Sequence, residues 1–229
     1  ILRSVPMATL PIPQPQPVPG SSVSLVAFYF PGPSRHHPGE RQDAYGRWTP
    51  WDEACQAPFL GNFWPCTLTI QPPGKPAGTF QTAEAAFQAT KWWDDDAVRH
   101  RFEAAKTGDE AYSIKSGLSG ADPSYAGFSR PGPHIPPYDE AREGAMWAVL
   151  SAKFAAPAFT AGLLATGDAY LLEHNESATR DRYWSDGRDG RGENRLGLQL
   201  MALRATLGGS GVPAGAPSLV DLAATAQAL

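Results

Sequence analysis

One predicted helix carries three polar residues whose types and spacing suit acid–base chemistry. In TAEAAFQATKWW (82–93), Glu84, Gln88 and Lys91 fall on one side of a helix, opposite small and apolar residues. These groups could act on a substrate if the helix aims them into a cleft, above all if partial burial raises the pKa of the carboxylate. The commoner alternative is a solvated helix face, on which Glu and Lys at this spacing stabilise the helix.

A second candidate site lies just before the last predicted helix. In RYWSDGRDGRGEN (182–194), three glycines are interspersed with arginines. Free backbone N–H groups at such a helix start, together with the helix dipole, favour an anion such as phosphate. Trp184 and Asp186 add a flat aromatic surface and an acceptor, which suit a stacked base and its amino groups. The spacing fits neither the P-loop nor the Rossmann pattern, and a flexible glycine turn explains the local sequence equally well.

Other kinds of site find little support in the sequence. Two cysteines, Cys55 and Cys66, are too few for a zinc framework, and we expect free thiols, with a single disulfide as the alternative. His36 and His37 lie in a proline-rich stretch without acidic or cysteine partners at ligand spacing. No serine or cysteine stands next to a plausible base. We therefore expect neither a metal ion nor an organic cofactor.

The composition limits the partners and the location of the chain. Hydrophobic residues make up 42% of the 229 residues and charged residues 18%, which is typical of a globular protein with one core. With a formal net charge of −4, any contact with nucleic acid must come from a local basic patch. No run approaches the roughly 18 apolar residues that a membrane helix needs, and the N-terminal residues do not resemble a secretory signal. We expect a cytoplasmic protein that does not bind membranes.

The elements that must position these residues do not alternate regularly enough for a doubly wound sheet. We predict a single compact α+β domain, mainly helical with a small β-sheet. Long loops are predicted over 31–50 and 107–138, the second with a short helix after Gly108. Strands are predicted within 21–32, 66–70 and 169–174, and helices within 82–93, 95–106, 139–157, 156–167 and 196–207.

Three segments divide the chain by composition. Residues 1–20 are rich in proline and predict a disordered or polyproline-like tail. Residues 21–208 contain the predicted strands and helices and form the domain. Residues 209–229 follow a Gly/Pro break and predict a weakly ordered, alanine-rich extension.

Three blocks in this order resemble the NADAR superfamily (NAD and ADP-ribose related, also called YbiA-like). They are LGNFWPC (60–66), TAEAAFQATK (82–91) and RYWSDGRDGRGENRLGLQLMALR (182–204). The segment 146–175 also resembles the helical core of that family, so that the resemblance covers roughly residues 25–207. It implies a compact, mainly helical α+β fold and N-glycosidase activity without a cofactor.

The resemblance also implies roles for individual residues. Glu84 would activate water or protonate the leaving amine, and Asp186 would orient or stabilise the sugar; one or both of these acids could do the chemistry. The remaining matched positions would bind substrate: Asn62, Phe63, Gln88, Lys91, Trp184, Gly187, Gly192 and Asn194.

Members of this family hydrolyse the bond between a ribose and an exocyclic amine. One branch acts on early phosphoribosylamino-pyrimidine intermediates of riboflavin biosynthesis, and another removes ADP-ribose from guanine in nucleic acid. The implied partner is therefore a phosphoribosyl or ADP-ribosyl small molecule, or ADP-ribosylated nucleic acid. Where relatives usually carry a Gly-Arg pair and a Trp followed by an acid, this chain has Gly117-Leu118 and Tyr138-Asp139, which leaves the substrate open.

Two alternatives to catalysis are consistent with the same residues. A non-catalytic module for ADP-ribose or a related nucleotide would keep Trp184 and the glycine loop and bind ligand without turnover. A purely structural domain would neither bind nor cleave.

Overall fold

The computed structural model describes residues 10–30, 42–43, 46–47, 49–130, 139–178 and 181–229. Several predictions therefore concern residues outside the described part of the chain. These are the first nine residues of the predicted tail, most of the loop predicted over 31–50 with His36 and His37, and Tyr138.

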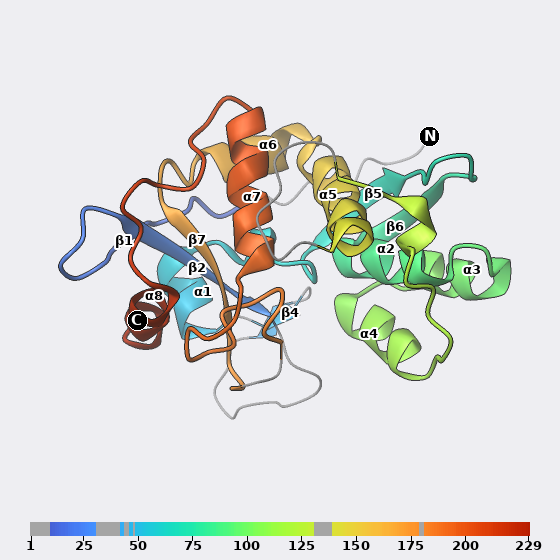
Figure 1. Ribbon diagram of the computed structural model, residues 1–229, viewed down its shortest axis with the longest axis horizontal. Coiled ribbons are helices and arrows are strands. Elements are labelled where there is room, and N and C mark those ends of the chain that lie inside the picture. Colours follow the sequence, from blue (N-terminus) through green and yellow to red (C-terminus); the bar gives the residue numbers. More distant parts are fainter. Residues whose placement is uncertain (1–9, 31–41, 44–45, 48, 131–138, 179–180) are drawn as a thin grey trace.

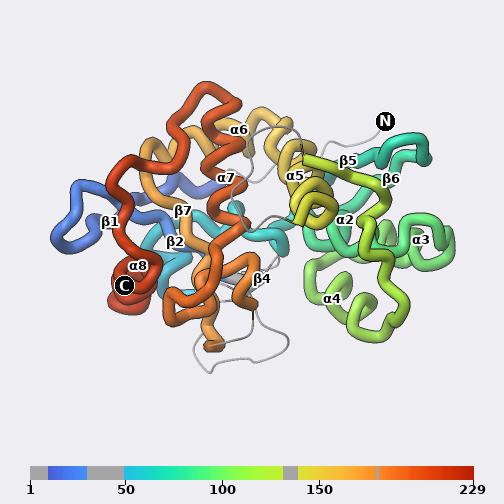
Figure 2. Tube along the Cα trace, in the orientation of Figure 1, coloured from blue at the N-terminus to red at the C-terminus, as the bar shows by residue number. Residues whose placement is uncertain are grey.

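The structure confirms an α+β fold in which helices predominate and the sheets are small. Figure 1 shows two groups of elements on either side of α5, and Figure 2 traces the path of the chain between them. Both groups contribute to the candidate site, because a cleft lined by residues of both lies between them.

The first group is built on a three-stranded sheet in the order β1–β2–β7. β2 runs antiparallel to β1 and parallel to β7, with Phe28 opposite Glu173. α1 packs on β2, α7 packs on β7, and α8 contacts both strands (Figure 1). The bounds are β1 Gln16–Pro17, β2 Ser24–Phe30, β7 Tyr170–Asn175, α1 Pro50–Cys55, α7 Arg195–Thr206 and α8 Leu219–Gln227. A separate two-stranded ladder joins β3 Gln42–Asp43 to β4 Gly46–Arg47.

The second group contains an antiparallel hairpin and three helices, of which the first two pack on the hairpin and the third packs on those two helices. Thr82 ends the second strand of the hairpin and caps the next helix, since its side chain accepts a hydrogen bond from the Ala85 N–H at 3.1 Å. The strand therefore passes directly into the helix that carries Glu84. The bounds are β5 Pro65–Ile70, β6 Gly78–Thr82, α2 Ala83–Ala89, α3 Asp96–Ala104 and α4 Gly108–Ser116.

Two consecutive helices, α5 (Glu140–Phe154) and α6 (Pro157–Leu164), complete the fold. α5 contacts β5 and α2 on one side and α7 on the other, and so joins the two groups. Within the described residues, no single helix is long and apolar enough to cross a membrane. In the same described part of the chain, one pair of helices, α5 and α6, has the length and composition to do so together, but the pair is bent by 105°.

The structure confirms most of the predicted elements, and both cysteines are buried and free as expected. It also adds the strand β6, which the sequence analysis missed because GTFQT has little strongly apolar character.

The two ends of the described chain are more ordered than predicted. β1 lies in the proline-rich segment, where Val18 is buried, so residues 10–20 are not a free tail. The C-terminal extension forms α8, which begins at the Ser218 cap and buries Leu222, Ala223 and Ala226. Both segments are held by packing against the first sheet, which a low local propensity does not reveal.

Candidate active site

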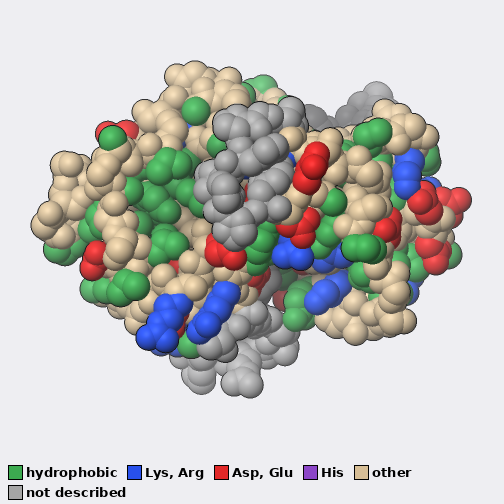
Figure 3. Space-filling view, in the orientation of Figure 1, with side chains coloured by type: hydrophobic (Ala, Val, Ile, Leu, Met, Phe, Trp, Pro, Cys, Tyr) green, Lys and Arg blue, Asp and Glu red, His purple; other side chains and the backbone are tan. Residues whose placement is uncertain are grey.

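The cleft between the two groups has a volume of about 220 Å³. It contains three carboxyl groups and two lysine side chains, close to aromatic rings. In Figure 3, acidic and basic side chains lie next to each other near the middle of the face shown. The lining residues come from both groups of elements: Asn62, Glu84, Phe87, Gln88, Lys91, Tyr112, Lys115, Met146, Glu173, Asp181 and Trp184.

The polar face of α2 points into this cleft. All seven residues of the helix are buried, including Glu84 (3% exposed) and Gln88 (7% exposed), because one face packs on the core and the other lines the cleft. The alternative of a solvated face is therefore wrong. A carboxylate and an amide are instead held where a small molecule can reach them.

A chain of hydrogen bonds links the three polar residues of this face. Lys91 Nζ donates to Gln88 Oε1 at 2.7 Å, and Gln88 Nε2 donates to Glu84 Oε1 at 2.8 Å. Burial raises the pKa of Glu84, against the hydrogen bond from Gln88 and the positive charges of Lys91 and Lys115. Burial also lowers the pKa of Lys91 to about 8, although the charge of Glu84 opposes this shift.

Asn62 lines the cleft, and its backbone holds the start of α2. Its carbonyl accepts a hydrogen bond from the Glu84 N–H at 2.9 Å, and its side-chain Nδ2 lies 3.6 Å from the sulfur of Met146. Phe63, the next residue, does not line the cleft. A Cβ atom on Gly108 would lie 2.3 Å from the Phe63 ring, so this ring packs tightly under the start of α4.

Trp184 forms an aromatic wall of the cleft. Its ring meets the ring of Phe87 edge-on, with 5.4 Å between centroids. The turn before it is fixed by Asp181, whose Oδ1 accepts hydrogen bonds from the N–H groups of Tyr183 at 3.0 Å and Trp184 at 2.9 Å. Asp181 itself also lines the cleft and was not singled out from the sequence.

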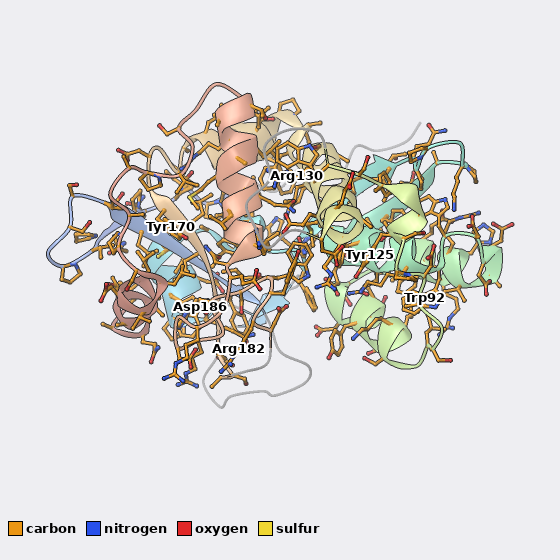
Figure 4. All side chains as sticks on the ribbon, viewed as in Figure 1. Trp92, Tyr125, Arg130, Tyr170, Arg182 and Asp186 are labelled. Atoms are coloured by element: carbon orange, nitrogen blue, oxygen red, sulfur yellow. The ribbon has the colours of Figure 1, made fainter. Side chains whose placement is uncertain are left out.

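Asp186 lies behind the wall of the cleft rather than in it. Its carboxylate is fully buried, and its Oδ1 accepts hydrogen bonds from the N–H groups of Asn175 at 3.1 Å and Arg188 at 2.7 Å. Its Oδ2 is 2.5 Å from His174 Nδ1. Figure 4 places Asp186 with the elements around β7, on the side away from Tyr125. These contacts attach the loop to β7, and the predicted contact of Asp186 with the sugar has no support in this geometry.

The predicted phosphate site at the start of α7 is not formed either. The N–H groups that would bind the anion donate to the chain itself: Gly192 to the Asp186 carbonyl at 2.8 Å, and Asn194 to the Ser185 carbonyl at 3.0 Å. Gly187 likewise donates to the Ser185 hydroxyl. The residues that line the cleft do not include Gly187, Gly192 or Asn194. Gly192 is needed for close packing, since a Cβ on it would lie 2.2 Å from the Ser185 carbonyl oxygen.

Glu173 is the main functional candidate that the sequence analysis missed. It lies in β7, is 1% exposed and lines the cleft, and its Oε2 has no hydrogen-bond partner among the described residues. Burial raises the pKa of Glu173 well above its usual range, and the charges of Asp181, Glu84 and Asp186 raise it further. The available signal was an acidic residue inside the apolar strand AYLLEH.

Among the described residues, no group of three or more His, Cys, Asp or Glu side chains is arranged to hold a metal ion.

Comparisons with known proteins point to one family. The NADAR domain model matches residues 50–208. N-glycosidase YbiA of Escherichia coli (strain K12) is 35% identical over 130 residues, which are 56% of this chain and 71% of that protein. A riboflavin biosynthesis protein of Vibrio vulnificus (strain YJ016) is 32% identical over 151 residues, 65% of this chain and 35% of that protein. The NMR structure of E. coli YbiA aligns with a TM-score of 0.48 and 26% identity, covering 81% of this chain and 88% of that one.

Proposed function

The chain belongs to the NADAR family, and from that premise we propose that it is an N-glycosidase. It hydrolyses the bond between a ribose and an exocyclic amine in a phosphorylated ribosyl heterocycle. The substrate is either an early phosphoribosylamino-pyrimidine of riboflavin biosynthesis or guanine carrying ADP-ribose in nucleic acid. The names of the relatives in E. coli and V. vulnificus support the reaction class and the first of these substrates.

The observation that carries the proposal is the burial of Glu84 in the cleft with Gln88 and Lys91 attached to it. A carboxylate in this position accepts a proton from a water molecule, and the water oxygen forms a bond to C1′ of the ribose. The C1′–N bond breaks, its electron pair leaves with the amine, and the amine takes up a proton. A carboxylate whose pKa is raised by burial is suited to this exchange of protons.

The rest of the cleft supplies binding groups for such a substrate. The ring of Trp184 offers a face to a heterocycle, a contact that for nucleobases is typically worth about 1–3 kcal/mol. Lys115 lines the cleft from α4 and provides a positive charge for a phosphate, in place of the glycine loop. Asp181 adds an acceptor for ribose hydroxyl groups.

Mass spectrometry after incubation with each candidate substrate tests the proposal. The free amine should be released from the phosphoribosylamino-pyrimidine or from an ADP-ribosylated guanine oligonucleotide, and the productive substrate identifies the branch. If neither is cleaved while ADP-ribose binds, the alternative of a non-catalytic binding module replaces the proposal.

The variant Glu84→Gln tests the carboxylate itself. Its turnover should fall by about 10²- to 10⁴-fold, the usual contribution of general acid–base catalysis. Glu103→Gln is the matched control, because Glu103 lies on α3 outside the cleft and pairs with Arg99 at 3.7 Å. A Glu84→Gln variant that turns over at the wild-type rate would exclude Glu84 from the mechanism.

A further inference from the structure

Glu173 is a second buried carboxyl group in the same cleft as Glu84, contributed by the opposite group of elements. We infer that Glu173 is the general acid that protonates the leaving amine, while Glu84 is the base that activates water. The inference deepens the proposed N-glycosidase function and rests on it.

The backbone of Glu173 is fixed on both sides. Its N–H donates to Asn194 Oδ1 at 2.9 Å, and its carbonyl accepts a hydrogen bond from the Asp186 N–H at 2.9 Å. In addition, β7 pairs with β2 through the register that sets Phe28 opposite Glu173. Asn194 and Asp186 thus act on the site as positioning residues, by holding the strand segment from which Glu173 reaches the cleft.

The unpartnered side-chain oxygen of Glu173 indicates that a ligand binds next to it. Among the described residues Oε2 has no hydrogen-bond partner and is shielded from solvent, a costly state for a polar atom unless a substrate completes it. A protonated carboxyl group carries one O–H group, which can donate a hydrogen bond, and then its proton, to the nitrogen of a leaving amine.

The charges around the two acids assign their roles. Burial raises the pKa of Glu173 well above its usual range, and the negative charges of Asp181, Glu84 and Asp186 raise it further, which favours the protonated group. For Glu84, by contrast, the hydrogen bond from Gln88 and the charges of Lys91 and Lys115 act to lower the pKa that burial raises. Two carboxyl groups whose surroundings differ in this way form an acid–base pair.

The proposed step is balanced in atoms and electrons. Water gives one proton to Glu84 and its oxygen to C1′, while Glu173 gives its proton to the exocyclic nitrogen as the C1′–N bond breaks. The products are the free amine and a ribose with a hydroxyl group at C1′. Afterwards Glu84 holds a proton and Glu173 is ionised, and exchange with solvent restores both groups.

Dependence on the leaving group tests this role. The wild type and Glu173→Gln are compared on the amine substrate that the wild type cleaves and on the same sugar phosphate carrying 4-nitrophenolate, which leaves as a stable anion without a proton. For Glu173→Gln, we expect turnover of the amine substrate to fall about 100-fold or more and turnover of the nitrophenyl substrate to fall less than about ten-fold. Glu84→Gln should be slow on both, because both need activated water.

Controls separate this role from a structural one. Glu176→Gln changes an acidic residue just beyond β7 that does not line the cleft, and it should keep the wild-type rate on the amine. If circular dichroism shows that Glu173→Gln is unfolded, Glu173→Asp retains the acid but withdraws it by one methylene group. The same selective loss on the amine substrate is then expected.

Three results would overturn the inference. A Glu173 variant with the wild-type rate on the amine substrate removes Glu173 from the reaction, as does an equal loss on both substrates, which indicates a structural effect. In both cases the proposed function stands, because the wild type still cleaves the amine. A wild-type protein that cleaves neither amine substrate removes the proposed function and the role of Glu173 with it.

Discussion

Gln88 donates a hydrogen bond from Nε2 to Glu84 Oε1 at 2.8 Å, across one turn of α2. The orientation of its amide is fixed, since its Oε1 is occupied by the ammonium group of Lys91 at 2.7 Å. The Gln88 amide therefore favours the ionised form of Glu84 even though the carboxylate is buried. The charge state of Glu84 thus depends on a lysine that it does not contact directly.

Removal of this lysine should shift the pH dependence of the reaction. In Lys91→Met the pKa of Glu84 rises further, because a positive charge that lowers it is lost. The base must be ionised, so the rise of kcat/KM with pH should move to higher pH than in the wild type. Lys91→Arg should restore part of the difference, and Lys106→Met, on the surface, should have no effect. An unchanged acidic limb in Lys91→Met would contradict the link between Lys91 and Glu84.

Trp184 should contribute mainly to substrate binding. Trp184→Ala removes an aromatic wall of the cleft, and we expect KM to rise on the order of ten-fold, the loss of one base–aromatic contact. Trp184→Phe keeps a ring and should lose less. Steady-state kinetics on the cleaved substrate give both values. If kcat falls while KM is unchanged, Trp184 acts on the reaction step rather than on binding.

Asp186→Asn distinguishes a structural from a catalytic aspartate. The change leaves the Oδ1 acceptor for Asn175 and Arg188 but alters the contact with His174, and we expect a loss of about 1–3 kcal/mol in the free energy of unfolding. Urea unfolding measures this loss. The kcat of the folded variant should fall less than that of Glu84→Gln. A fall in kcat as large as that of Glu84→Gln, with an unchanged free energy of unfolding, would show that Asp186 takes part in the reaction.

Gly192 should not tolerate a side chain. In Gly192→Ala the new Cβ would lie 2.2 Å from the Ser185 carbonyl oxygen, so the loop or the start of α7 must move, at about 1–3 kcal/mol or more. Gly117→Ala is the matched control, since its Cβ would meet nothing closer than 3.7 Å. Urea unfolding of both variants checks the difference. If Gly192→Ala and Gly117→Ala have equal free energies of unfolding, the loop accommodates the added methyl group without strain.

Lys153 should make the stability of the protein depend on pH. Its ammonium group is buried, donates to the Gly61 carbonyl at 2.8 Å, and has a pKa lowered by burial to about 8. Between pH 8 and 10.5 the unfolded chain holds this proton and the folded chain does not, so the Lys153 contribution to stability becomes more favourable as pH rises.

Unfolding of the wild type and Lys153→Met across this range isolates that contribution. As pH rises through this range, the free energy of unfolding of the wild type should increase relative to that of Lys153→Met by on the order of 3 kcal/mol. The difference between the two proteins is the quantity to follow, because it cancels groups that titrate in both. A constant difference would show that Lys153 titrates alike in the folded and unfolded chains.

The acid–base helix could be predicted from the sequence because its features are local. The spacing of Glu84, Gln88 and Lys91 defines a helix face, and α2 forms with that face intact. The choice between a solvated face and a cleft could not be made from spacing. It depends on α4 and β7, which bring Lys115 and Glu173 to the cleft from other parts of the chain.

Glu173 and the glycine loop escaped prediction for physical reasons. In a strand that alternates between core and solvent, an acidic residue at a core position is easily recognised. All six residues of β7 are buried, so its sequence pattern does not show which face Glu173 lies on. In the glycine loop the residue types suit an anion, yet the N–H groups of Gly192 and Asn194 are used within the chain. Which carbonyl a backbone donor meets is decided by tertiary structure.

The pairing of β2 with β7 also bears on how much of the chain can fold alone. The segment that matches the NADAR domain begins at residue 50, whereas the strand that pairs with all six residues of β7 is Ser24–Phe30. A fragment cut at residue 50 would leave the hydrogen-bonding edge of β7 open. Such an edge recruits strands from other molecules, so the fragment would tend to aggregate or to exchange strands between copies. We therefore expect the autonomous folding unit to be larger than the segment by which the family is recognised.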